Sequence, residues 1–121
     1  MGDMLVRLYD LPDLSAPMRD LAASGIEIRR ALAPEQHLVL MWVREKFSNG
    51  WASECDVAFA RQPVACFLAV KHGSICGFAC YEATCRNFFG PVGVDPAARG
   101  AVIGKALTLA CLHAMAAEGY G

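Results

Sequence analysis

The chain has 121 residues and a formal net charge of −1, from 11 basic and 12 acidic residues. This length is enough for one domain with a single core, over residues 1–121, and too short for two. Apolar residues make up 55% of the chain and charged residues 19%, against usual values of about 45–50% and about 25%. That balance argues against disorder, and the lack of a basic cluster gives nucleic-acid binding no electrostatic support.

The sequence predicts neither a membrane span nor a secretion signal. No apolar run reaches the roughly 18 residues needed to cross a bilayer, and residues 1–6 lack a signal-peptide pattern. We therefore expect a cytoplasmic protein whose cysteines stay reduced and pack as small apolar residues. Three of the six cysteines, Cys76, Cys80 and Cys85, could form a metal site with His72, but their spacing is wrong for a zinc knuckle. No metal is expected.

The first half of the chain alternates between strand and helix patterns. Residues 4–9 predict a short strand, and apolar residues at helical spacing predict a helix over 14–22. Strict alternation over Ile26–Ala31 predicts a second strand. Pro34 suits the first turn of a helix whose apolar stripe extends from Leu38 to Phe47.

The second half predicts a short helix, three strands and a long helix. Ser53 and Asp56 resemble a capping box that begins a helix ending at Ala60. His72-Gly73 predicts a tight hairpin. The remaining runs predict strands over 66–71, 74–82 and 88–94 and a helix over 99–118. The order β-α-β-α-α-β-β-β-α favours an α+β fold, with a sheet that has helices on both faces.

The segment from Val94 to Leu107 has the pattern of an anion-binding turn. A strand ends at Asp95-Pro96, and a glycine-bearing loop then opens a helix that is nearly all apolar. Backbone N–H groups and the positive end of the helix dipole meet at such a point, which suits a phosphate. The alternative is an ordinary strand–turn–helix with incidental glycines. A P-loop is not supported, because Gly104-Lys105 is followed by alanine.

Within this segment, Arg99-Gly100-Ala101-Val102-Ile103-Gly104 is similar to the Arg/Gln-x-x-Gly-x-Gly/Ala motif of the GNAT superfamily of N-acetyltransferases. The flanking Val94-Asp95-Pro96 and the order of elements agree with that family. The resemblance implies a mixed, mostly antiparallel sheet with helices on both faces. Residues 26–121 would be the N-terminal part of the GNAT fold and residues 1–25 an extension. The usual C-terminal strands would be lacking.

The resemblance also implies a cofactor, acetyl-CoA. Its pantetheine arm would follow the strand at Gly93 and Val94, and its pyrophosphate would lie on the loop and helix start. The residues implied for the pyrophosphate are Arg99, Gly100, Ala101, Val102, Ile103, Gly104 and Lys105. Glycine allows close backbone approach, and cationic side chains favour an anion. Val102 replaces the motif's middle glycine, so its side chain either crowds the phosphates or points into the core.

The implied reaction is transfer of an acetyl group to an amine, carried by a small molecule or by a protein. Such transfer needs a group that takes the amine proton and one that protonates the thiolate. Tyr81 and Glu82, at the end of a strand, are the candidates, and Glu54 is another possible base. Each is more often a solvated surface residue. Four aromatic residues could line an acceptor pocket or pack in the core: Trp42, Trp51, Phe88 and Phe89.

A second hypothesis belongs to a different class. If the later strands of the fold are lacking, the strand over 88–94 has an unpaired apolar edge, which favours pairing with another chain. The chain would then be a non-catalytic or incomplete acyl-CoA-binding module that forms a homodimer. Release of free thiol in the presence of amines separates an enzyme from such a binder.

Overall fold

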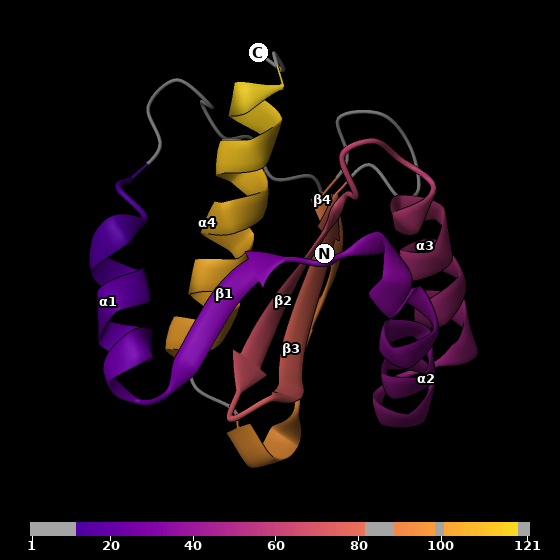
Figure 1. Cartoon of the computed structure of the whole chain (residues 1–121), viewed down its shortest axis with the longest axis horizontal. Coiled ribbons are helices and arrows are strands. Elements are labelled where there is room, and N and C mark those ends of the chain that lie inside the picture. Colours follow the sequence, from indigo (N-terminus) through magenta and orange to yellow (C-terminus); the bar gives the residue numbers. More distant parts are fainter. Residues whose placement is uncertain (1–11, 82–88, 99–100, 119–121) are drawn as a thin grey trace.

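The computed structural model describes residues 12–81, 89–98 and 101–118. These residues form an α+β fold with four α-helices and a four-stranded antiparallel sheet in the order β1-β2-β3-β4 (Figure 1). The elements are α1 (Ser15–Ala23), β1 (Ile26–Arg30), the 3-10 turn η2 (Ala33–Glu35), α2 (Gln36–Lys46), α3 (Asn49–Phe59), β2 (Cys66–Lys71), β3 (Ser74–Tyr81), β4 (Phe89–Val94), the 3-10 turn η3 (Pro96–Ala98) and α4 (Ala101–Ala117). The predicted α+β class is confirmed, whereas the predicted strand over 4–9 lies outside the described residues.

The sheet lies between two helical layers. Figure 1 shows α1 and α4 on one side and α2 and α3 on the other. Alternation along β3 explains this arrangement, since successive side chains point to opposite faces. A Cβ atom at Gly77 would lie 3.1 Å from Leu107 on α4. The ring of the next residue, Phe78, packs edge-to-face with the rings of Trp42 and Trp51 on the α2–α3 side.

The last helix, α4, is buried on most of its circumference. Its buried residues are Ile103, Ala106, Leu107, Leu109, Ala110, Cys111, Leu112, Ala114 and Met115. The helix packs on β2, β3 and β4 and also against α1. Two covered sides explain why its sequence is apolar almost all round, as its composition predicts.

The start of α3 differs from the sequence prediction. The predicted start at Ser53 is wrong, because α3 begins at Asn49. Ser48 is the N-cap, with extended backbone, and its Oγ accepts a hydrogen bond of 3.0 Å from the N–H of Trp51. Asn49-Gly50 looks like the stop of one helix but lies in the first turn of the next. A serine cap supplies an acceptor for orphan N–H groups, which offsets the weak helix propensity of glycine.

The hairpin between β2 and β3 has the predicted two-residue turn. His72 and Gly73 have φ angles of 50° and 82°, and Lys71 is the partner of Ser74. The register then shifts between Ala69 and Val70, so that Cys66 lies opposite Cys80. This bulge decides which side chains share a face of the sheet.

Candidate functional site

The turn between β4 and α4 is held by Asp95. Its backbone N–H donates to the carbonyl of Cys76 at 2.8 Å, and its carboxylate accepts from the N–H of Ala97 at 2.9 Å. The Nζ atom of Lys46 lies 3.3 Å from the other carboxylate oxygen. The Ala97 hydrogen bond and then Lys46 hold the pKa of Asp95 below its usual value. Asp95 therefore holds the described start of this turn, up to Ala98.

The first residues of α4 divide between surface and core. Val102 is 49% exposed and Lys105 is exposed, while Ile103 is buried. Of the two alternatives for Val102, an orientation into the core is therefore wrong. Ala101 is the first helical residue, and Arg99 and Gly100 lie outside the described residues. The structure thus presents Val102 and Lys105 on one accessible turn of the helix.

Gly104 is not required by packing among the described residues. A Cβ atom there would meet Cγ2 of Val94 at 3.9 Å, which is ordinary contact. Its carbonyl accepts a hydrogen bond of 2.9 Å from the hydroxyl of Thr108. Glycine costs about 1 kcal/mol relative to alanine inside a helix. A ligand that approaches the backbone would account for that cost.

Gly93 has a clear packing reason. A Cβ atom at this position would lie 2.6 Å from Cζ of Phe47, far inside contact distance. The Phe47 ring packs in turn on Trp42, Trp51 and Phe78, with centroid separations of 5.7, 5.0 and 5.8 Å. These four rings form an aromatic cluster between α2, α3 and the sheet. Trp42 and Trp51 are partly buried and pack against the core, while the side chains of Phe88 and Phe89 lie outside the described part.

The strand β4 is an edge strand of the described sheet and carries a bulge. Its pairing with β3 passes from Ala79–Val92 to Tyr81–Phe89. Gly90 and Pro91 therefore face the single residue Cys80, and Gly90 has a φ of 124°. Proline lacks an N–H, so it fits a bulge on an edge strand. Bulges re-aim side chains or end the pairing of a strand, and they are frequent next to active sites.

Tyr81, one of the two catalytic candidates, is fully buried on the α4 side. Its hydroxyl accepts from Nη1 of Arg30 at 2.8 Å and donates to the carboxylate of Glu118. Burial and then the Glu118 bond raise the pKa of Tyr81. This contact joins β1, β3 and the C-terminal end of α4. The catalytic role of Tyr81 stays a prediction, and Glu82 lies outside the described residues.

The described cysteines are all buried free thiols, as the prediction of apolar packing required. Sequence reasoning missed that three of them meet. The Sγ atoms of Cys55, Cys66 and Cys80 all lie within 4.8 Å of one another. Donation from the other two thiols lowers the pKa of Cys55, whereas donating to Cys55 raises the pKa of Cys66 and of Cys80. A regular hairpin brings Cys66 and Cys80 close together, but only the bulge makes them a direct pair on one face of the sheet. The sequence alone does not reveal that bulge.

No protein-family model matches the chain, and no curated protein or solved structure matches it either. In the part of the chain that the structure describes, no helix combines the length and apolarity that a membrane span requires. The fold and site define an α+β domain with an edge strand, a carboxylate-held turn and an accessible helix start.

Proposed function

We propose that the chain is an acetyltransferase domain that binds acetyl-CoA at the β4–α4 junction and transfers its acetyl group to an amine. The observation that carries this proposal is that an edge strand, the Asp95 turn and a first turn of α4 with exposed Val102 and Lys105 follow one another along the chain. An edge strand and a helix N-terminus serve two different parts of one long, anionic ligand.

The start of α4 suits the pyrophosphate. The first N–H groups of a helix have no partner within it, and the dipole places roughly half a positive charge there. Lys105 is exposed one turn into the helix, and helical side chains lean toward the N-terminus. Its ammonium can therefore reach an anion at that end. Gly104, for which packing among the described residues supplies no need, lets the ligand approach the backbone.

The edge of β4 suits the pantetheine arm. This arm is extended and contains two amide groups, and an edge strand offers N–H and C=O groups to an extended ligand. The bulge at Gly90-Pro91 interrupts the regular pairing with β3, and a bulged strand bends at that point. The thioester would lie along this strand.

In the proposed reaction the amine nitrogen forms a bond to the thioester carbonyl carbon and the carbon–sulfur bond breaks. The amine proton passes to a base, for which Glu82 is the candidate, and the thiolate of coenzyme A accepts a proton. The hydroxyl of Tyr81 is buried and already takes part in two hydrogen bonds within the protein. This observation favours a second candidate function. In that case the domain binds acyl-CoA without catalysis and self-associates through β4.

Isothermal titration calorimetry with acetyl-CoA tests the binding. We expect Lys105→Gln to raise the Kd about tenfold, the effect of losing a charged hydrogen bond of about 1.5 kcal/mol. Arg44→Gln is the matched control, since it removes an exposed cation from α2 on the opposite face of the sheet (Figure 1). No heat of binding to the wild-type chain, or equal effects of the two variants, contradicts the proposal.

Two further measurements separate the enzyme from the binder. An enzyme releases free thiol from acetyl-CoA when candidate amines are supplied, and a binder does not. If the binder dimerises through the edge of β4, coenzyme A and the second chain compete for the same backbone groups. Sedimentation at micromolar concentration should then show dimers that dissociate when coenzyme A is added. A monomer with and without coenzyme A excludes the self-associating form.

A further inference from the structure

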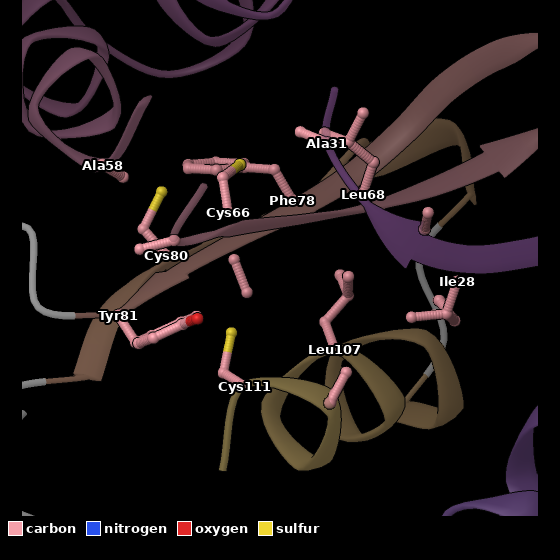
Figure 2. Close-up of a cluster of buried hydrophobic side chains, with 14 of the residues drawn as sticks. Ile28, Ala31, Ala58, Cys66, Leu68, Phe78, Cys80, Tyr81, Leu107 and Cys111 are labelled. Carbon is pink, nitrogen blue, oxygen red and sulfur yellow. The ribbon is translucent and has the colours of Figure 1, made fainter. Parts of the chain in front are cut away.

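Three cysteine sulfurs from three elements meet in the layer between α3 and the sheet. Cys55 lies on α3, Cys66 is the first residue of β2, and Cys80 is the last residue but one of β3. All three are 0% exposed. Figure 2 shows Cys66 and Cys80 on the side of the sheet near Ala58 of α3, whereas Cys111 lies on α4 on the other side. We call Cys55, Cys66 and Cys80 the sulfur cluster.

The spacing of the sulfur cluster fits one ion. The Sγ atoms of Cys55 and Cys66 are 4.0 Å apart, and no pair in the cluster exceeds 4.8 Å. Metal–thiolate bonds are about 2.3 Å long, so three sulfurs placed in a plane around one ion are about 4.0 Å apart. A tetrahedral site would bring them to about 3.8 Å. The observed spacing therefore lies nearer to trigonal coordination.

The donor set decides which ion fits. Among the described residues, no histidine, aspartate or glutamate joins the three sulfurs in the cluster. Mg²⁺ and Ca²⁺ require oxygen ligands, and structural Zn²⁺ takes four ligands. Thiolate ligands select Cu(I), Zn²⁺ and iron–sulfur clusters, and iron–sulfur clusters, like structural Zn²⁺, take four protein ligands. We propose that the sulfur cluster is a site for one Cu(I) ion, held by Cys55, Cys66 and Cys80 in three-coordinate geometry.

The fold brings these sulfurs together in a way that apolar packing does not require. Next to the turn, Lys71 pairs with Ser74 and Val70 pairs with Ile75. If this register continued along the whole hairpin, Cys66 would pair with Ala79. The side chains of Cys66 and Cys80 would then point to opposite sides of the sheet. The bulge between Ala69 and Val70 shifts the register by one residue and places both on the α3 side. Binding forms copper–sulfur bonds, the thiol protons leave to solvent, and copper stays monovalent. This site is independent of the acetyl-CoA proposal.

The test is an anaerobic titration of the full, reduced chain with Cu(I) in competition with the chelator bicinchoninate. We expect the chain to retain one copper and each of Cys55→Ala, Cys66→Ala and Cys80→Ala to lose it to the chelator. Two matched controls should keep it: Cys111→Ala, buried on the opposite face of the sheet, and Cys76→Ala. Copper retained by Cys66→Ala, or lost by a control variant that still folds, overturns the assignment.

A second measurement does not depend on variants that fold. X-ray absorption of the copper-loaded wild-type chain should show three sulfur ligands, and alkylation in mild urea followed by mass spectrometry should show protection of Cys55, Cys66 and Cys80 together. Zn(II), added to the reduced chain under the same conditions, should bind less tightly than Cu(I). The proposal is refuted if the chain retains no copper or if the spectrum shows a nitrogen or oxygen ligand. It is also refuted if other cysteines are protected instead, or if the chain binds Zn(II) more tightly than Cu(I).

Discussion

Gly93→Ala should destabilise the protein through a single clash with the aromatic cluster. The added Cβ would lie 2.6, 2.8 and 3.0 Å from three atoms of the Phe47 ring. To restore a contact of 3.4 Å, the ring would have to move by about 0.8 Å. The ring cannot move freely, because Trp42, Trp51 and Phe78 pack around it. Overpacking of this kind costs about 1–3 kcal/mol of unfolding free energy.

Urea unfolding followed by tryptophan fluorescence measures this loss, since both tryptophans of the chain lie in the cluster. The decisive comparison repeats the substitution in a Phe47→Leu background, where the smaller side chain leaves room for the new methyl group. There the cost of Gly93→Ala should fall by at least half. An unchanged midpoint for Gly93→Ala, or an equal cost in the two backgrounds, would refute the clash.

Three further predictions address the proposed acetyl-CoA site, the stability of the fold at acidic pH and a buried hydrogen bond. Gly104→Ala should raise the unfolding free energy by about 0.5–1 kcal/mol, because the added methyl group fits. The same variant should bind acetyl-CoA more weakly in calorimetry. Equal affinity of the variant and the wild type contradicts a contact between the ligand and the backbone at Gly104. Glu35→Gln should cost about 1–2 kcal/mol at pH 7 after allowance for solvent screening. The Arg29 hydrogen bonds lower the pKa of Glu35 from 4.5 to about 2, so this difference should vanish in urea titrations as pH falls between those values. Tyr81→Phe should lower the unfolding free energy by about 1–2 kcal/mol, because the Glu118 carboxylate loses its buried hydrogen-bond donor. A variant that unfolds at the same temperature as the wild type contradicts this role of Tyr81.

Much of the fold could be predicted because its signals are local. The hairpin at His72-Gly73 needs only a two-residue turn between β runs, and the apolar pattern of α4 reflects burial on two sides. The start of α3 could not be placed in this way. Ser48 and Ser53 both suit an N-cap, and the choice falls to Ser48, whose hydroxyl reaches the N–H of Trp51.

The candidate site likewise has features that neighbouring residues predict and a contact that only the structure reveals. The Asp95-Pro96 turn and the glycine-bearing helix start are visible as a run of neighbouring residues, and the structure places a turn and an accessible helix there. The ion pair of Asp95 with Lys46 joins residues far apart in the chain. No local pattern predicts such a contact.

By itself, the sequence determined the α+β class, the hairpin, the apolar last helix and the turn before it, because each depends on the periodicity or turn chemistry of adjacent residues. The tertiary structure decided which distant side chains meet. One bulged residue in the β2–β3 ladder puts Cys66 and Cys80 on the same face, because a shift of one residue reverses every side chain of a strand. The approach of Phe47 to Gly93 likewise exists only once α2 packs on the sheet.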